Sequence, residues 1–149
     1  MQVDTQRMID RVVGTFICRL FSVVAAFRKR RRAPGKVRRI LIILLSEMGS
    51  LTLAYPMMRR LAQKYPDATL SVLTFERNRE IIDILGYVDN KCVVGIRDIS
   101  LGRLTLDSCK AIWRIRRYSP DVVIDGELFS RISSIYSFLS KAPVRAGFF

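Results

Sequence analysis

Two short polar segments hold the side chains that could do chemistry in this chain. The first, Ser46-Glu47-Met48-Gly49-Ser50, follows a nearly continuous apolar run. Glu47 is either a catalytic base or a solvated loop carboxylate, and Ser50 is a plausible N-cap of the helix expected next. The N–H groups at the start of that helix would stabilise an anionic group. The segment has one glycine, Gly49, and matches neither GxGxxG nor GxxxxGK[ST], which disfavours a dinucleotide or P-loop site.

The second polar segment, Asp125-Gly126-Glu127, also follows an apolar run and brings two carboxylates together. Asp125 either contacts a substrate or only accepts hydrogen bonds from the backbone of the neighbouring loop. Arg131 lies one helical turn beyond Glu127, so it either binds an acidic acceptor or pairs with that glutamate. Arg145 is expected near the same edge of the fold, or else it is an ordinary surface charge.

The composition excludes several kinds of site. The 149 residues contain no histidine, which rules out Ser-His-Asp triads, Cys-His nucleophiles and HExxH zinc sites within them. The three cysteines, Cys18, Cys92 and Cys109, are widely spaced without a CxxC pair, which predicts neither a disulfide framework nor a metal site. We expect all three to be small buried side chains in a reducing compartment. The length allows one ordinary domain or one half of a two-lobed enzyme.

The elements that must position the two polar segments alternate between strands and helices. Nearly continuous apolar runs predict strands at 37–45 and 121–125, and β-favouring residues predict another at 69–75. Shorter strands are expected at 91–94 and 144–148, and helical spacing predicts helices at 51–65, 77–85, 101–118 and 130–139. In the helix at 101–118 we expect Trp113 and Ile115 to face inward. This alternation predicts an α/β fold in which an open, mostly parallel sheet lies between two helical layers.

In such sheets ligands bind beyond the carboxyl ends of the strands, where the strand order reverses. If the strands at 37–45 and 121–125 are central neighbours, the two polar segments face one crevice. We therefore expect the chemistry of the chain to take place there.

The N-terminal segment differs in charge from the rest of the chain. Residues 1–40 hold 11 Lys/Arg against 2 Asp/Glu, whereas residues 41–149 hold 15 against 11, so most of the net charge of +13 belongs to the start of the chain. Apolar residues recur there at helical spacing, and a basic cluster follows directly. The residues expected to contact a membrane are Phe16, Leu20, Phe27, Arg28, Lys29, Arg30, Arg31 and Arg32.

We expect residues 8–27 to form an amphipathic helix on an anionic membrane surface. The apolar stretch is shorter than the roughly 20 residues that a span needs, and Arg19 interrupts it. Three alternatives stay open: a cleaved signal peptide, a spanning signal anchor, and a helix that packs on its own domain or on a partner helix. Ala33-Pro34-Gly35 breaks the helix and divides the chain into residues 1–35 and residues 36–149. Nucleic acid is disfavoured as a partner because the body is only mildly basic.

Four pieces of the sequence, taken in order, resemble a known family. The run 36–45 precedes the first polar segment, and Pro56 comes seven residues after Gly49. The other three pieces are Tyr65-Pro66-Asp67-Ala68, residues 119–127 (SPDVVIDGE) and Val144-Arg145-Ala146-Gly147-Phe148. Over residues 36–149 this order is similar to the amino-terminal half of glycosyltransferase family nine, the ADP-heptose:lipopolysaccharide heptosyltransferases.

The resemblance implies an enzyme of the GT-B type with two Rossmann-like lobes, of which this chain is the acceptor-binding one. The residues that would contact a glycolipid or glycan acceptor of the cell envelope are Gly49, Asp125, Arg131 and Arg145. A nucleotide-sugar donor would bind the other lobe, and this lobe would hold no cofactor. An inverting transfer without metal is expected, in which a carboxylate near the first helix deprotonates an acceptor hydroxyl. The protein would lie in the cytoplasm, on the inner face of the cytoplasmic membrane.

Two departures from the family pattern affect this expectation. The usual Gly-Asp pair, whose Asp is the expected base, is Gly49-Ser50 here, and a serine hydroxyl needs activation before it can take a proton. Glu47, Ser50 and Glu127 are therefore the catalytic candidates. The sequence also stops at Phe149, where family members continue into a second lobe, so we expect this chain alone to be inactive. The alternative is a stand-alone α/β binding module with a basic membrane- or nucleic-acid-binding arm and no catalysis.

Overall fold

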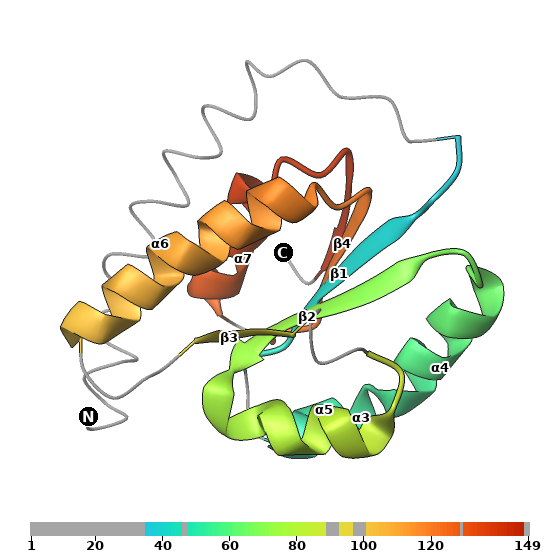
Figure 1. Ribbon diagram of the computed structural model, residues 1–149, viewed down its shortest axis with the longest axis horizontal. Coiled ribbons are helices and arrows are strands. Elements are labelled where there is room, and N and C mark those ends of the chain that lie inside the picture. The colour runs from blue at the N-terminus through green and yellow to red at the C-terminus, as the bar shows by residue number, and fades with distance from the viewer. Residues whose placement is uncertain (1–34, 46–47, 89–92, 97–100, 129, 148–149) are drawn as a thin grey trace.

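The computed structural model describes residues 35–45, 48–88, 93–96, 101–128 and 130–147, which build an α/β fold around one parallel sheet (Figure 1). The sheet has five strands in the order β3-β2-β1-β4-β5, and every neighbouring pair is parallel. The strands are β1 (Arg39–Ile43), β2 (Thr69–Phe75), β3 (Val93–Ile96), β4 (Val122–Asp125) and β5 (Val144–Gly147). Each expected strand is confirmed, with ends that differ by at most two residues.

Helices cover both faces of this sheet, as the alternating pattern predicts. They are α3 (Met48–Leu53), α4 (Tyr55–Lys64), α5 (Arg79–Leu85), α6 (Leu101–Tyr118) and α7 (Arg131–Leu139), with a 3-10 turn, η2 (Glu76–Asn78), before α5. Figure 1 shows α3, α4 and α5 below the sheet and α6 and α7 above it. The Rossmann-like three-layer architecture is therefore confirmed.

The single helix expected at 51–65 is two helices that meet at Ala54. Pro56, in the first turn of α4, has no N–H to donate, and its ring would clash with the carbonyl four residues earlier. The helix therefore ends before the proline and restarts with Pro56 near its beginning, where a missing N–H costs nothing.

β1 is the centre of the core because its side chains are buried on both faces of the sheet. Ile40 and Ile42 pack with Leu51 and Met58 on the side of α3 and α4. On the other face the core residues from β1, α6 and α7 are Leu41, Ile43, Ala111, Ile115 and Tyr136. Burying one such large aliphatic side chain stabilises the fold by about 1.5–3 kcal/mol, which explains why an uninterrupted apolar run is needed here.

The orientation expected for α6 is wrong at two positions. Ile115 is buried as expected, but Trp113 is 61% exposed and Cys109 is also exposed. Ala111 and Ile115, one turn apart, set the inward face, and Trp113 stands about 200° around the helix from Ala111. Cys18 and Cys92 lie outside the described residues.

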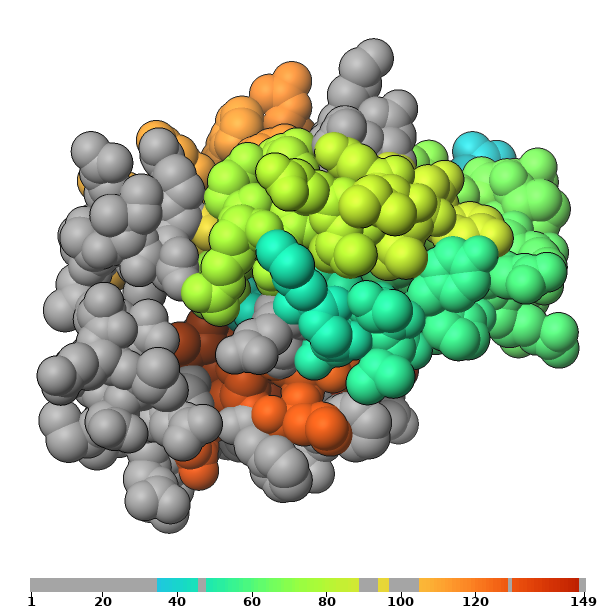
Figure 2. Space-filling view, turned by 90° about the horizontal axis from the view of Figure 1, so that it is seen from below, coloured from blue at the N-terminus to red at the C-terminus, as the bar shows by residue number. Residues whose placement is uncertain are grey.

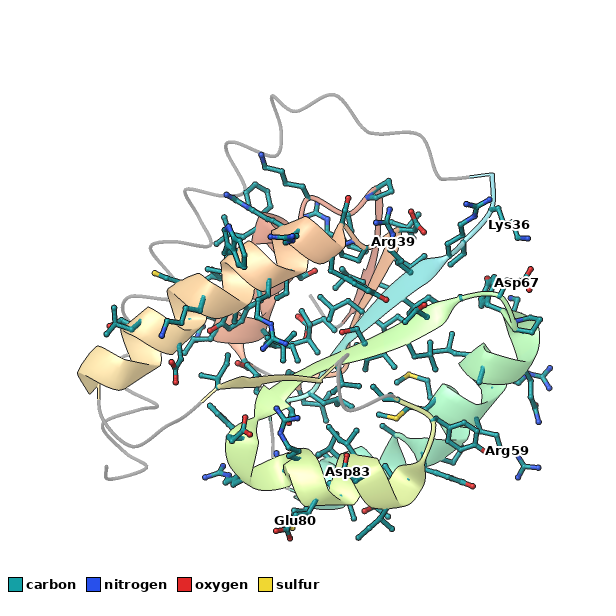
Figure 3. The ribbon with its side chains drawn as sticks, viewed as in Figure 1. Lys36, Arg39, Arg59, Asp67, Glu80 and Asp83 are labelled. Carbon is teal, nitrogen blue, oxygen red and sulfur yellow. The ribbon has the colours of Figure 1, made fainter. Side chains whose placement is uncertain are left out.

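Charged side chains form hydrogen bonds and an ion pair at the amino ends of the strands. This edge of the sheet is opposite the one where the polar segments lie. The Asp121 carboxylate accepts hydrogen bonds from the backbone N–H groups of Arg38 and Arg39, each at 2.9 Å. Lys36 and Asp67 form an ion pair of 2.8 Å at the same edge, where Figure 3 shows both side chains. The hydrogen bond and the positive charge of Lys36 lower the pKa of Asp67.

Within the described ranges, no helix is long and apolar enough to cross a membrane. The residues expected to contact a membrane, from Phe16 to Arg32, lie outside those ranges. The proposed boundary at residue 35 stays a prediction for the same reason.

Candidate functional site

The strand order reverses between β1 and β4, which places the candidate site at the carboxyl ends of these two strands. From β1 the chain builds β2 and β3 on one side and then crosses through α6 to β4 on the other side. β1 and β4 are direct neighbours, and their last residues, Ile43 and Asp125, are register partners. The expected adjacency of the two central strands is confirmed, so the segments that follow them leave the sheet side by side.

The segment after β1 leads from the sheet into α3. Leu44 and Leu45 remain buried, and the N–H of Leu44 still donates to the Leu73 carbonyl of β2 at 3.0 Å. Glu47, the candidate base, lies outside the described residues. Gly49 is exposed in the first turn of α3, with nothing within 4 Å of where a Cβ would stand.

Ser50 is not the N-cap that its position suggests. The helix begins at Met48, two residues earlier, so Ser50 is its third residue, half-buried, and its carbonyl accepts a hydrogen bond from the N–H of Ala54 at 3.0 Å. The catalytic role considered for Ser50 stays a prediction.

Asp125 is the most enclosed carboxylate at the site. It is the last residue of β4, only 2% exposed, and its Oδ1 accepts a hydrogen bond from the N–H of Glu127 at 3.2 Å. The Ser133 side chain of α7 lies beside this carboxyl. Burial raises the pKa of Asp125 above its ordinary value, and the nearby Glu127 charge adds to the rise, while the Ser133 side chain and the backbone N–H of Glu127 oppose it.

Gly126 and Gly147 allow the backbones of β1, β4 and β5 to approach one another closely around Asp125. The N–H of Gly126 donates to the Ile43 carbonyl of β1 at 3.0 Å, which ties the second polar segment to the first strand. A Cβ at Gly126 would stand 2.8 Å from Cδ2 of Leu44. A Cβ at Gly147 in β5 would stand 2.8 Å from Cβ of Asp125 and 3.1 Å from its carbonyl oxygen. Glycine is therefore required at 147 by the packing against Asp125, a role that the sequence analysis did not assign.

Glu127 lies beside Asp125 at the start of the loop that leads to α7, and it is 6% exposed. Ser130 caps α7: its Oγ accepts from the N–H of Ser133 at 3.5 Å, and the Ser133 hydroxyl donates to the Ser130 carbonyl at 2.8 Å. This cap fixes where α7 starts and therefore where Ser133 meets Asp125. A serine three residues after a capping serine is the sequence signal that could have identified Ser133.

The two arginines expected at the site have different positions. Arg131 is the first residue of α7 and half-buried, which places its backbone next to the second polar segment. Arg145 is exposed on β5 opposite Val123, and its guanidinium lies 5.3 Å from the ring centroid of Phe138. Phe138 is seven residues beyond Arg131 on α7, about 10 Å further from the carboxyl edge. The structure therefore brings Asp125, Glu127 and Arg131 together and places the charge of Arg145 elsewhere.

The surface around the switch point has exposed apolar residues, whereas Asp125 and Glu127 are buried beneath it. Figure 2 shows α3 in teal and the orange residues around the start of α7 on one face of the molecule. Exposed large hydrophobic residues in these two elements and the β4–α7 loop are Met48, Leu53, Leu128 and Ile132. Among the residues that the structure describes, no group of three or more Cys, Asp or Glu side chains could hold a metal ion. The carboxylates of Asp125 and Glu127 could accept hydrogen bonds or protons from a ligand.

Fold and site together define a Rossmann-like α/β domain with a candidate ligand position at its β1–β4 switch point. No family model and no curated protein matches the sequence. Solved structures do match the fold. A glycosyltransferase of family 9 from Veillonella parvula DSM 2008 matches 77% of this chain with a TM-score of 0.65 and 15% sequence identity.

The heptosyltransferase WaaC of E. coli gives two further matches. Its structure with ADP covers 73% of this chain with a TM-score of 0.55, and its structure with ADP-2-deoxy-2-fluoro heptose covers 73% with a TM-score of 0.54, both at 18% identity. The resemblance to family nine structures is therefore confirmed at the level of the fold. The chain spans 33% to 36% of the length of the protein chain in these three structures, about a third.

Proposed function

We propose that this chain is the acceptor-binding lobe of a glycosyltransferase. The longer enzyme transfers a heptose or related sugar from a nucleotide-sugar donor to a lipopolysaccharide or another cell-envelope glycan. The observation that carries the proposal is the fold match at a TM-score of 0.65 to a family 9 glycosyltransferase, over a chain whose buried Asp125 and Glu127 follow one of the two strands at the switch point.

The residues at the switch point suit a sugar acceptor. Carboxylates accept hydrogen bonds from sugar hydroxyls, which Asp125 and Glu127 would do at the end of β4. Arg131, at the start of α7, would bind a phosphate or carboxylate on the acceptor. In the transfer itself, Glu47 or Glu127 takes the proton of one acceptor hydroxyl as its oxygen attacks the anomeric carbon of the donor. The nucleoside diphosphate leaves with the electrons of the broken C–O bond, and the configuration at that carbon is inverted.

A second lobe would complete the donor side of this enzyme. The short length relative to the three similar structures supports it, and so do the exposed apolar residues of α3 and of the start of α7, which a packed second lobe would shield from water. Because transfer needs donor and acceptor held together, we expect the 149-residue chain to release no product from any nucleotide sugar. Turnover by the purified chain would disprove the two-lobe proposal.

Acceptor binding is tested directly on the chain as it stands. We expect a de-acylated lipopolysaccharide core oligosaccharide to shift the backbone NMR signals of Gly49 and of residues 126–131. Glu127→Gln removes one charged acceptor of hydrogen bonds and should weaken binding about 10-fold, since such a bond contributes roughly 1.5–3 kcal/mol. Glu80→Gln, an exposed change on α5, is the control and should bind as the unaltered chain does. Equal affinities for all three proteins would remove the second polar segment from the acceptor site.

The base is tested in the chain completed by its second lobe. Glu47→Gln keeps the size and hydrogen-bonding groups of the side chain and removes its charge, so we expect a loss of about 10²–10⁴-fold in turnover. Glu127→Gln is the matched change across the crevice, and Ser50→Asp tests whether the usual base of the family works in this scaffold. If Glu127→Gln alone loses activity, Glu127 is the base. Full activity in both Gln variants would exclude both glutamates.

A further inference from the structure

The outer face of α6 carries a row of residues that the fold does not use. Leu106, Lys110, Trp113 and Arg117 follow one another at steps of four, three and four residues, which places all four within about 60° around the helix. We call this row the α6 stripe. The buried residues Ala111 and Ile115 stand on the opposite side, toward the sheet.

The α6 stripe combines exposed apolar groups with positive charge. Leu106 is 63% and Trp113 is 61% exposed, and the Arg117 guanidinium lies 5.4 Å from the Trp113 ring centroid. Lys110 and Arg117 are exposed, and so is Arg114 at the margin of the stripe. The sequence of α6 has a single acidic residue, Asp107, and that side chain is buried. The outward face of the helix is therefore uniformly cationic around an exposed indole.

This combination fits the headgroup region of a membrane. A tryptophan ring has an apolar body and one polar N–H, which suits the boundary between lipid headgroups and acyl chains. Lysine and arginine beside it are attracted to anionic headgroups, and their long stems reach past the surface of the helix. From Leu106 to Arg117 the stripe gives a contact line of about 17 Å along such a surface.

The charge of residues 1–34 argues against the idea that this segment of the same chain covers the α6 stripe. Residues 1–34 contain 8 Lys/Arg and 2 Asp/Glu, so they carry the same sign as the stripe and would be repelled by it. We propose that the α6 stripe is a docking surface for an anionic lipid bilayer, with Leu106 and Trp113 at the headgroup boundary and Lys110, Arg114 and Arg117 at the lipid phosphates. The proposal is independent of the sugar-transfer function and of any membrane contact made by residues 1–34.

Trp113 reports on this surface directly because it is the single tryptophan of the chain. We expect vesicles of phosphatidylcholine and phosphatidylglycerol to shift its fluorescence to the blue, and brominated acyl chains in those vesicles to quench it. Vesicles of phosphatidylcholine alone should do neither, and high salt should reverse the effect. The signal comes from α6 even if the rest of the full-length chain also binds the vesicles.

Charge reversal on α6 is compared with a matched reversal on the opposite face. Lys110→Glu with Arg114→Glu and Arg117→Glu should weaken the vesicle-dependent change at Trp113 by about 100-fold in lipid concentration, given three cations at an anionic surface. The control changes three exposed cations of α4, Arg59→Glu with Arg60→Glu and Lys64→Glu. Figure 3 shows Arg59 on α4, on the other side of the sheet from α6. The control should keep the Trp113 response, and circular dichroism checks that both triple variants are folded.

Several outcomes would overturn the proposal. One is a chain that sediments with anionic vesicles while Trp113 emission stays unchanged, because binding then uses another surface. Another is an equal loss of the response in the two triple variants, which would report total charge rather than the α6 stripe. A response to single-stranded RNA without one to vesicles would assign the stripe to nucleic acid. If the triple α6 variant does not fold, Lys110→Glu and Leu106→Ser as single changes make the same comparison.

Discussion

Asp125 shows how one residue can be suited to a site and unfavourable for stability. Its carboxylate is almost completely enclosed, next to the Glu127 carboxylate and the Ser133 side chain, and it accepts one backbone hydrogen bond, from the N–H of Glu127. Because burial raises its pKa, the folded protein holds a proton on Asp125 more readily than the unfolded chain does. The free energy of unfolding must therefore fall as pH rises from the ordinary value of 3.8 through the raised pKa.

Asp125→Asn should remove this part of the pH dependence. The amide oxygen can still accept the N–H of Glu127, so the change takes away the buried charge and keeps the shape. We expect the variant to be at least as stable as the unaltered chain at pH 7, with the difference vanishing toward pH 3 in urea unfolding experiments.

Asp67→Asn should show the opposite pH dependence of the free energy of unfolding. The pKa of Asp67 is lowered, so its contribution is present at neutral pH and is lost as pH falls through the lowered pKa.

Gly147 and Gly49 make a second comparison at the scale of single residues. Gly147→Ala puts a methyl group 2.8 Å from Cβ of Asp125, and the pairing of β5 with β4 prevents the strands from separating. We expect a loss of about 1–3 kcal/mol in the free energy of unfolding. Gly49→Ala meets open space inside a helix and should raise stability by up to about 1 kcal/mol. Equal stabilities for the two variants would show that β5 does not pack closely on Asp125.

The residues of the candidate site differ in how far sequence reasoning could locate them. Asp125 and Glu127 were predictable because they directly follow an apolar run, and the end of a parallel strand lies at the ligand edge. The contacts of Asp125 with Ser133 and Gly147 depend on how α7 and β5 are placed against β4, which no local pattern encodes. Arg145 was expected near the site from its distance along the chain, whereas its charge lies against Phe138.

At the scale of elements, Asp121 links the starts of β1 and β4. One carboxylate oxygen accepts the N–H groups of both Arg38 and Arg39. Asp121→Ala leaves these donors to water, and we expect a loss of about 1–3 kcal/mol in urea unfolding. Asp83→Ala, an exposed change on α5, should stay within about 0.5 kcal/mol of the unaltered chain. A loss in the Asp121 variant no larger than in the Asp83 variant would mean that the strand pairing alone aligns β1 and β4.

The elements themselves were largely predictable, and the errors have physical causes. A strand buried on both faces favours a continuous apolar run, so β1 and β4 stand out in the sequence, whereas β2 is marked by its β-favouring residues. The division between α3 and α4 follows from Pro56. Its ring and its missing N–H interrupt the helix, although the apolar residues keep their helical spacing across the break. The helical spacing of apolar residues in 101–118 predicts Trp113 on the inward face, yet the facing direction of α6 is set by Ala111 and Ile115, which pack in the core against the sheet.

At the scale of the whole molecule, we expect residues 1–35 to bind the protein to anionic membranes. We expect removal of these residues to move most of the protein from the pellet of anionic vesicles to the supernatant, because both the apolar stretch and the basic cluster are lost. High salt should release the full chain in part, since it screens the charges and leaves the apolar contact. Unchanged sedimentation of the shortened chain would contradict a membrane role for this segment.

The position of β1 in the sheet also determines when it can be completed during synthesis. Ile40 pairs with Leu70 on one side and with Val122 on the other, so its two partners leave the ribosome 52 residues apart. At 5–20 residues per second this separation lasts roughly 3–10 seconds. During that time the most apolar strand of the protein has one edge open to other nascent chains and to chaperones. The central strand is thus enclosed late, and the polar segment after it gains its neighbour only once Asp125 has been made.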